Sequence, residues 1–389
     1  MANDLTITQA NQLIASLHQQ ATGVAVATPT DLSSFISVAN STLAAGYDNV
    51  IGAISQMVGA TLIAVRPYTR KFAGLRYDTA EFGGIIRKIN FADLDPEASS
   101  VYSLTDGQGV DQYVVKKPKV LQTNYVGSDE WQSHYTIFSS QLNQAFSSPQ
   151  ALGEFFTGLL THFSNEREQW LENMSRATVA NFIAGKNAMG GTYDVIHLLT
   201  EYNTATGLNL TATTVRQPAN FPAFMKWAYA RVSELCAKMG ERSELFQKKI
   251  TGYKINRHTP LEYMRVYILD SYLKAMTAEV LADAYHDNFL SQADVEGVGF
   301  WQSIQQPDVV KVTPVVMKDD GTYEKAEAQD MSNVIGVIFD RDAIGYNIYE
   351  DTVDTTPYNA RGKFYNMWAH SRVQYQNDFS EKGFVLALD

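Results

Sequence analysis

The feature that most constrains this fold is one long amphipathic segment near the middle of the chain. Ser148 is a typical helix N-cap and Pro149 is favoured at the first helical position, whereas Gly185 and Lys186 are typical of a helix end. Between these signals, apolar residues recur at close to the 3.6-residue period: Leu152, Phe155, Phe156, Leu159, Leu160, Phe163, Trp170, Leu171, Met174 and Phe182. The pattern predicts a single helix over residues 149–184.

The length of this helix predicts an elongated subunit. At ~1.5 Å per residue the helix is about 54 Å long, whereas a compact globule of 389 residues has a radius of gyration of only about 21 Å. The opposite face of the helix carries Glu154, Glu166, Arg167, Glu168 and Glu172. We interpret this face as solvated or partner-facing, and we place Glu166, Glu168 and Glu172 in an assembly interface.

A second constraint is a strand-rich region before the helix. Residues 83–95 and 113–125 are β-leaning runs with partial alternation, and a stretch rich in turn residues separates them. Pro118 restricts the second run to an edge strand. The simplest interpretation is a long two-stranded ribbon that would extend roughly 40 Å at ~3.3 Å per residue. Because an isolated hairpin is only marginally stable in water, the ribbon must lie on another surface.

The charge distribution indicates what that surface could be. From Arg66 to Lys119 the chain has nine Lys or Arg and seven Asp or Glu, a balance of +2, so the rest of a chain of net charge -11 stands at -13. Lys116, Lys117 and Lys119 are the cluster that we expect to meet an acidic surface, although solubility and protection of a strand edge explain them too.

Composition excludes several classes of protein. The net charge of -11 argues against a chain that wraps nucleic acid, which requires a basic face. A single cysteine, Cys236, rules out disulfides within the chain and favours a reducing compartment. The N-terminus has no early Lys or Arg and is not read as a signal peptide. The most apolar run, residues 50–65, is shorter than the ~20 residues of a membrane-spanning helix, and we expect it to be buried.

The sequence contains little that points to catalysis. Phosphate-loop, dinucleotide-binding, zinc-protease and nucleophile-elbow motifs are absent, and the seven histidines are scattered singly, without metal-ligand spacing. Asp340 and Asp342 are two carboxylates placed two residues apart at a predicted strand end, so that both lie on one face. They could form a metal or acid–base pair, but a tight turn and Arg341 explain them as well. We expect no cofactor and no metal.

The order of elements resembles the major capsid proteins of tailed bacteriophages, which have the HK97-type fold. The likeness extends over essentially the whole chain and is carried by three runs: "RATVANFIAGK" at the end of the long helix, "NRHTPLEYMRVYILDSYL" with "EVLADAYH" farther on, and "VIGVIFDRDAIGYNIYEDTVDTTPYNARGKFYNMWAH" near the C-terminus. The resemblance implies an α+β fold with an N-terminal arm, an extended β-ribbon loop, a long spine helix and a mixed axial domain.

The resemblance also implies a division of the chain and a set of partners. The expected parts are a helical arm (1–66), an extended loop (67–147), a peripheral domain with the spine helix (148–199), an axial domain (200–333) and return strands of the peripheral domain (334–389). Such a subunit assembles with its own copies into hexamers and pentamers of an icosahedral shell around double-stranded DNA, with scaffolding, portal and possible decoration proteins. Assembly in the host cytoplasm, localisation in the virion capsid and no membrane contact are expected.

Some proteins with this fold cross-link a ribbon Lys to a peripheral-domain Asn. Here Lys88, Lys116, Lys117 and Lys119, together with Asn359 and Asn366, supply the chemical groups. No motif assigns a particular pair, so the cross-link stays an open alternative.

The aromatic stretch from residue 356 to residue 379 has a role in this interpretation. We expect its rings to pack strands against the spine helix, while Arg361, Lys363 and Arg372 meet neighbouring subunits. Three other functions stay open: an encapsulin-type compartment shell, a metal-dependent hydrolase that uses Asp340 and Asp342, and a nucleic-acid-binding module with a basic ribbon.

Overall fold

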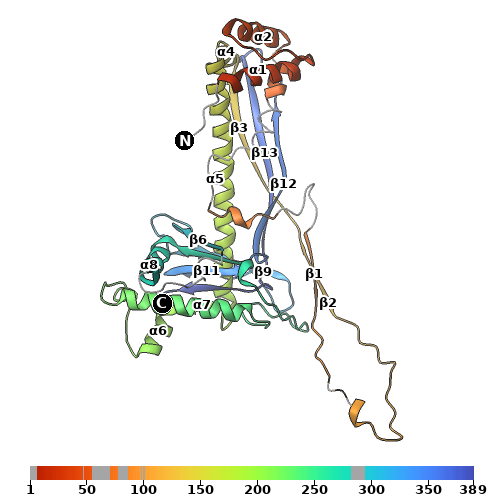
Figure 1. Ribbon diagram of the computed structural model, residues 1–389, viewed down its shortest axis with the longest axis vertical. Coiled ribbons are helices and arrows are strands. Elements are labelled where there is room, and N and C mark those ends of the chain that lie inside the picture. Colours follow the sequence, from red (N-terminus) through yellow and green to blue (C-terminus); the bar gives the residue numbers. More distant parts are fainter. Residues whose placement is uncertain are drawn as a thin grey trace. The chain divides into compact units, whose positions relative to one another are not determined.

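The long helix is α5, Pro149–Met189, and its 41 residues correspond to about 60 Å (Figure 1). It continues one turn beyond the predicted end at residue 184. Gly185 lies inside the helix and is buried, so it does not mark the helix end. Lys186 is also fully buried, with its ammonium 2.9 Å from Asp194 Oδ1. The helix ends before Gly190, whose φ of 63° is the left-handed conformation that glycine adopts without strain.

The structure is a computed structural model that describes residues 7–46, 48–54, 71–77, 86–97, 99, 101–281 and 294–389. The chain forms two units. The first unit comprises Met1–Gly84, Gly127–Met174 and Asn347–Gln374, and the second comprises Ile85–Val126, Ser175–Tyr346 and Tyr375–Asp389. The long helix contributes its N-terminal part to the first unit and its C-terminal part to the second.

The first unit contains a three-stranded sheet beside the long helix. Its order is β12 (Ile344–Thr355), β13 (Phe364–Asn377) and β3 (Asp129–Phe138), with β13 antiparallel to β3 (Figure 1). Along β13 buried and half-buried residues alternate from Phe364 to His370. This period of two is typical of a sheet with one face on the core.

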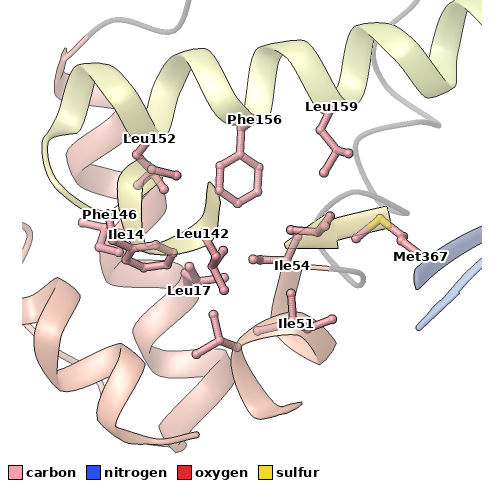
Figure 2. Close-up of a cluster of buried hydrophobic side chains, with 14 of the residues drawn as sticks. Ile14, Leu17, Ile51, Ile54, Leu142, Phe146, Leu152, Phe156, Leu159 and Met367 are labelled. Carbon is pink, nitrogen blue, oxygen red and sulfur yellow. The ribbon is translucent and has the colours of Figure 1, made fainter. Parts of the chain in front are cut away.

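The core of the first unit is built from helices and from the inner face of this sheet. Figure 2 shows Leu152, Phe156 and Leu159 of α5 directed at side chains of the N-terminal helices and at Met367 of β13. The cluster also contains Leu142 of the short helix α4, Ser139–Ala145. The apolar stripe predicted for the first half of the long helix is therefore its buried face.

The N-terminal helices of the first unit are α1 (Ile7–Thr22) and α2 (Leu32–Ala44), and residues 48–54 are helical as well. Asp31 caps α2, since its carboxylate accepts a hydrogen bond from Ser34 N at 2.7 Å. A short 3-10 helix, Ala73–Leu75, also belongs to this unit. In the apolar run predicted to be buried, Val50, Ile51 and Ile54 are buried, and residues 55–65 lie outside the described part of the chain.

The second unit is centred on a five-stranded sheet. Its strand order is β4 (Val195–His197), β14 (Gly383–Ala387), β11 (Val334–Asp340), β5 (Met264–Leu269) and β6 (Asp294–Val298). The two outer pairings, β4 with β14 and β5 with β6, are parallel, and the two inner pairings are antiparallel. Every residue of β11 and β14 is buried, because these strands occupy the interior of the unit.

Helices and short ladders surround this sheet. The helices are α6 (Leu198–Thr206), α7 (Phe221–Gly240) and α8 (Asp270–Leu281), with a 3-10 turn at Leu261–Tyr263 (Figure 1). The ladders pair β7 (Val310–Val312) with β10 (Gln329–Met331) and β8 (Val315–Met317) with β9 (Tyr323–Lys325). In α7 the buried residues Phe224, Ala228 and Val232 recur at helical spacing. Residues 282–293 lie outside the described part of the chain.

The ribbon is a two-stranded antiparallel ladder that belongs to the second unit. Strand β1 (Ile86–Phe91) pairs with β2 (Val120–Tyr125), from Ile86 opposite Tyr125 to Phe91 opposite Val120. Beyond the ladder, the described residues of the two limbs form no further strand, and Val101–Ser103 is a 3-10 turn. The ladder is shorter than the predicted runs and begins after Pro118, as expected from the missing N–H of proline.

One segment lies in a different place from that expected. Residues 129–138 form β3 and pair with β13 in the sheet of the first unit. They were expected to belong to the extended loop, residues 67–147. The five-part division of the chain stays a prediction. No helix among the described residues is long and apolar enough to cross a membrane.

Candidate assembly site

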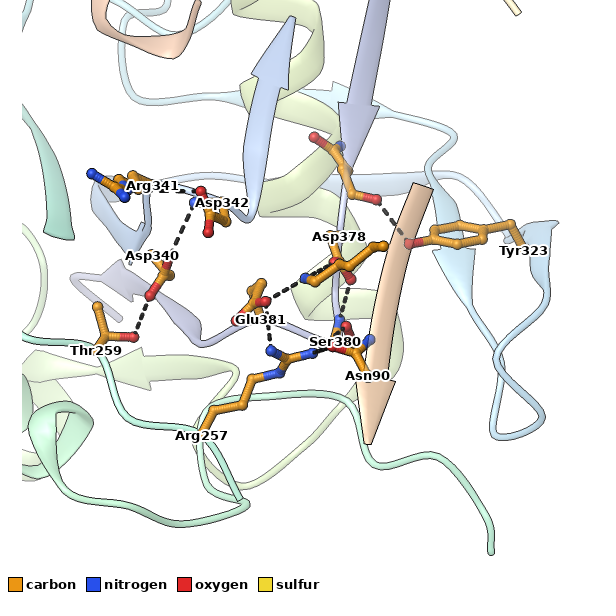
Figure 3. A network of polar contacts seen from close by, with 12 residues as sticks. Asn90, Arg257, Thr259, Tyr323, Asp340, Arg341, Asp342, Asp378, Ser380 and Glu381 are labelled. Carbon is orange, nitrogen blue, oxygen red and sulfur yellow. Dashed lines mark hydrogen bonds and ion pairs between the residues drawn. The ribbon is translucent and has the colours of Figure 1, made fainter. Parts of the chain in front are cut away.

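The base of the ribbon is held by a buried cluster of charges in the second unit. The ammonium of Lys88, on β1, donates to the carboxylates of Asp378 and Glu381, which lie between β13 and β14 (Figure 3). Arg257 approaches Glu381 at 2.7 Å and donates to Asn90 Oδ1 of β1 at 3.0 Å. Since the Asp378 and Glu381 side chains are only 1% and 8% exposed, each carboxylate depends on these cations for stabilisation.

A second set of contacts fixes the limbs next to the ladder. Asp93 accepts hydrogen bonds from Asn256 N at 2.8 Å and from Asn256 Nδ2 at 2.9 Å, and it pairs with Arg242. These hydrogen bonds, first among them that from the Asn256 backbone, lower the pKa of the Asp93 carboxyl. On the other limb, Lys119 Nζ donates to the carbonyl of Gly252 at 3.1 Å. The ribbon is therefore attached to its own unit on both limbs.

Burial changes the titration of the groups at the base. Burial raises the pKa of Glu381 even though Lys88 and Arg257 oppose that shift. Burial also acts to raise the pKa of Asp378, but the charge and hydrogen bond of Lys88 outweigh it, so that the pKa of Asp378 is lowered. On β2, burial and the nearby charge of Asp378 raise the pKa of Tyr125.

The limbs beyond the base are exposed. Every residue from 101 to 120 is exposed, and the ribbon presents large apolar side chains to solvent: Ile89, Phe91, Leu94, Val101, Tyr102, Leu104, Val110, Tyr113, Val114, Val115 and Val120. So many exposed large apolar side chains within one ribbon are unusual on an isolated soluble subunit and are typical of an interaction site.

The three predicted ribbon lysines have different environments. Lys116 forms an ion pair across the ribbon with Glu97, and both side chains are more than half exposed. Lys117 is exposed, and Lys119 makes the contact with Gly252 described above. An exposed pair of this kind contributes at most about 1 kcal/mol, so Lys116 can exchange its partner readily.

The predicted acidic face of the long helix is largely internal. Glu168 and Glu172 are 2% and 5% exposed, and Glu172 accepts a hydrogen bond from Lys71 N at 3.0 Å. Of the three glutamates assigned to an interface, Glu166 alone is partly exposed, with contacts to Ser133 and to His162 at 3.3 Å. The expectation of a solvated face is therefore wrong for Glu168 and Glu172, because the helix is packed on more sides than its apolar stripe suggested. Their assignment to an assembly interface stays a prediction.

The predicted cations near the C-terminus lie on the surface of the first unit. Arg361 and Lys363 are exposed in the turn between β12 and β13, and Lys363 has a φ of 53° there. Arg372 of β13 is exposed, and its Nε donates to Ser128 Oγ at 2.6 Å. Their contact with neighbouring subunits stays a prediction.

The aromatic residues of the same stretch divide between two environments. Tyr365 belongs to the buried core cluster of the first unit, and Phe379 stacks on Phe182 of the long helix at 5.1 Å in the second unit. These two rings pack as expected. Trp368 does not, since it lies on the opposite face of the strand from Tyr365 and stacks on His134 at 4.7 Å.

The candidate catalytic pair has a structural explanation. Asp340 is buried, and its carboxylate accepts hydrogen bonds from Thr259 Oγ1 at 2.7 Å and from Asp342 N at 3.0 Å (Figure 3). Asp342 is exposed and lies 3.8 Å from Arg341. Asp340 thus closes the turn after β11. No group of three potential metal ligands occurs among the described residues.

The possible cross-linking groups are engaged in local contacts. Lys88 is bound in the charge cluster at the ribbon base. Asn359 Oδ1 accepts from Gly362 N at 2.9 Å, and Asn366 Oδ1 accepts from Thr136 Oγ1 at 2.7 Å. Which Lys and Asn could react stays open.

The partners of the ribbon base were not predicted from the sequence. Asp378 and Glu381 lie in "NDFSEKGFVLAL", where charged residues directly precede an apolar strand. Charges so close to a buried run are a signal for a buried ion pair, but Arg257 is more than 100 residues away and nothing in the local sequence connects it to Glu381.

Comparison with solved structures identifies the fold. The capsid structure of Staphylococcus phage Andhra has 12% sequence identity and a TM-score of 0.52, covering 84% of this chain and 86% of that one. A chain from the structure of the head fiber and inner core protein gp22 of native bacteriophage P68 has 11% identity and a TM-score of 0.54, covering 82% and 85%. At this identity the likeness shows the fold alone: the α+β, HK97-type fold of phage capsid proteins.

The sequence itself specifies the family. Residues 10–381 match the Phi29-like phage major capsid protein family, and the chain belongs to it. No curated protein matches the sequence. The chain is therefore a structural subunit of a bacteriophage capsid shell, and it functions by assembling with copies of itself.

Proposed function

We propose that this chain is the building block of a closed icosahedral shell around the double-stranded DNA of a phage, and that its ribbon docks on an adjacent copy. The observation that carries the docking is the ribbon itself. Its base is attached by Lys88, Asp93 and Lys119, whereas residues 101–120 are all exposed and include many large apolar side chains. A surface of this kind is stabilised when another molecule covers it.

The wider organisation follows from membership of the capsid family. We expect hexamers and pentamers of this chain, with scaffolding and portal proteins and possible decoration proteins as partners, assembled in the host cytoplasm. The chain acts without catalysis of its own. Its net charge of -11 suits a container whose wall does not bind the enclosed genome tightly. An encapsulin-type shell is the alternative with the same architecture, and the family match favours the phage shell.

Electron microscopy of the purified chain tests this proposal. We expect hollow shells, or rings of five and six copies, in negative stain. A species that stays strictly monomeric at high concentration would contradict it. Binding of duplex DNA that weakens steeply with salt would instead favour a nucleic-acid-binding module.

Charge reversal tests the ribbon's part in assembly. For the variant Lys116→Glu, Lys117→Glu, Lys119→Glu we expect a folded subunit with an unchanged circular dichroism spectrum, but little or no particle formation. The matched control reverses three exposed lysines elsewhere, Lys249→Glu, Lys311→Glu and Lys325→Glu. Normal assembly of the ribbon variant would show that the charges of these lysines are not needed for assembly.

A further inference from the structure

The dipeptide Asp-Gly occurs at two turns of the chain and has a reactivity of its own. Asp106 and Gly107 lie in the exposed outer part of the ribbon, whereas Asp320 and Gly321 lie in the turn between β8 and β9. Glycine has no side chain to shield its backbone nitrogen, so this nitrogen can approach the carboxyl carbon of the preceding Asp closely. Because the two turns contain the same dipeptide, a difference in their reactivity must come from the structure around it.

The ribbon turn leaves both reacting groups without a partner. Gln108 N donates to the carbonyl of Thr105 at 3.1 Å, and Thr105 N donates to Gln108 Oε1 at 3.2 Å. Gly107 lies between them with a φ of 83°, in the left-handed conformation that favours glycine. Neither Gly107 N nor the Asp106 carboxylate forms a hydrogen bond with another residue of the described part of the chain.

The surroundings of the ribbon turn are open. Every residue from 101 to 120 is exposed, and a Cβ on Gly107 would have no heavy atom of the described residues within 4 Å apart from its chain neighbours. Residues 104–110 belong to no helix or strand. Rotation of the Asp106 side chain and of the following peptide plane therefore breaks no ladder and displaces no packed group.

The turn between β8 and β9 holds the same two groups in place. The Asp320 carboxylate accepts hydrogen bonds from Thr322 N at 2.9 Å and from Thr322 Oγ1 at 2.6 Å, and Gly321 N donates to the carbonyl of Lys318 at 3.0 Å. The hydrogen bonds from Thr322, first that of its side chain, lower the pKa of the Asp320 carboxyl. A lowered pKa leaves less of the protonated acid, which is the form that can lose its OH as water.

We propose that Asp106 and Gly107 form a site of spontaneous isoaspartate formation, and that the turn at Asp320 is protected from the same reaction. Gly107 N attacks Cγ of the protonated Asp106 carboxyl. The new N–C bond closes a succinimide ring, and the amide proton and the carboxyl OH leave as water. Water then adds to the ring. Opening at the side-chain carbonyl restores Asp106, whereas opening at the main-chain carbonyl leaves the chain running through the former side chain.

The product changes the outer part of the ribbon without a change of mass. One water leaves and one is added, so the reaction needs no oxidant, reductant or other co-reactant. The main chain becomes one carbon longer at Asp106, and the free carboxylate is attached directly to Cα. The extra carbon lies inside the turn that the hydrogen bond between Gln108 N and Thr105 O closes, so it alters the spacing of these groups. The altered form accumulates with the age of the subunit.

Ageing of the full-length subunit tests this assignment. Free subunits, kept below the concentration for assembly, are incubated at neutral pH for increasing times, then denatured and digested with trypsin. Asp106 lies in the tryptic peptide 89–116 and Asp320 in the peptide 319–325, so that the two sites are measured separately. Protein isoaspartyl methyltransferase with labelled S-adenosylmethionine detects isoaspartate in each peptide, and fragmentation in the mass spectrometer locates it.

We expect isoaspartate to form at Asp106 faster than at Asp320 by about tenfold or more, because three hydrogen bonds must break first at Asp320. Unfolding is the matched control: in concentrated urea these hydrogen bonds are lost, and the two sites should react at similar rates. Thr322→Val removes one donor to Asp320 and should raise isoaspartate there while leaving Asp106 unchanged. Asp106→Glu, whose longer side chain does not close the same ring, should abolish the signal in the peptide 89–116.

The possible outcomes decide the inference without reference to particle formation, so the result is independent of the proposed function. Equal rates at the two sites in the folded subunit would contradict protection at Asp320. A folded subunit that gains no isoaspartate at Asp106, although the urea-unfolded chain does, would overturn the site on the ribbon. Unchanged isoaspartate at Asp320 in the Thr322→Val chain would contradict the role of that hydrogen bond.

Discussion

At the scale of single residues, the most consequential group is Lys88. It joins strand β1 of the ribbon to two buried carboxylates, Asp378 and Glu381, and Arg257 completes the charge balance. Removing one partner of a buried ion pair is much more costly than removing an exposed pair, because the remaining charge has neither water nor a counter-ion. Lys88 therefore stabilises the attachment of the ribbon base and is not an ordinary surface lysine.

Substitution of Lys88 tests this role. We expect Lys88→Met to lower the free energy of unfolding by about 2–4 kcal/mol at pH 7, measured by urea denaturation. Lys116→Met, which removes an exposed pair of the same ribbon, should cost less than about 1 kcal/mol. Adding Glu381→Gln to Lys88→Met should restore part of the loss.

The cost of Lys88→Met should depend on pH in a defined direction. Because the pKa of Glu381 is raised above 4.5, Glu381 takes up a proton before Asp378 as the pH falls. The neutral carboxyl of Glu381 no longer requires the positive charge of Lys88. The pKa of Asp378 is lowered below 3.8, so the stability that it contributes is present above 3.8 and is lost as the pH falls through its folded value. The difference between wild type and Lys88→Met should therefore shrink in acid. A difference that stays constant from pH 7 to acid would show that Lys88 acts through packing alone.

At the scale of elements, the long helix shows how far local signals reach. Its start at Pro149 and its apolar stripe were predicted correctly, because capping and periodicity are properties of neighbouring residues. The end of the helix was predicted wrongly, because Gly185 is needed for a close tertiary contact and does not mark the helix end. A Cβ at Gly185 would lie 2.5 Å from the Phe379 ring, which is itself stacked on Phe182.

Two glycines of this helix form a natural pair for a test. Gly185→Ala should lower the free energy of unfolding by about 1–3 kcal/mol, since the methyl group displaces the Phe379 ring from a packed site. Gly158→Ala, an exposed position with nothing within 4 Å, should raise it by up to about 1 kcal/mol through helix propensity alone. Thermal or urea unfolding of the two variants gives the comparison. Equal effects of the two substitutions would contradict the role of Phe379.

At the scale of the whole molecule, the subunit is adapted to assembly. Residues 101–120 of the ribbon are all exposed in the single chain and include several large apolar side chains. The charge balance of the sequence indicated an acidic surface complementary to the ribbon, but a sum of charges cannot locate that surface in the fold.

Assembly should protect the ribbon from proteolysis. In free subunits, kept below the concentration for assembly, we expect trypsin to cut first after Lys116 and Lys119, which lie in an exposed extended segment. In particles the same cuts should be slower by about tenfold or more. Mass spectrometry of the fragments locates the sites, and Lys116→Gln with Lys119→Gln should abolish them. Equal cleavage of ribbons in particles and in free subunits would show that the ribbon stays uncovered.

The sequence by itself determined the properties that depend on near neighbours in the chain: the start of the long helix, the ribbon strands and the lack of a catalytic motif. Only the tertiary structure decided which charges are buried. Glu168 and Glu172 carry the same charge as Glu166 on the same helix, but two of the three are internal. The ribbon base joins Lys88, Arg257 and Glu381 from three distant segments. Burial and ion pairing depend on which segments meet in space, and the local pattern of residues does not contain that information.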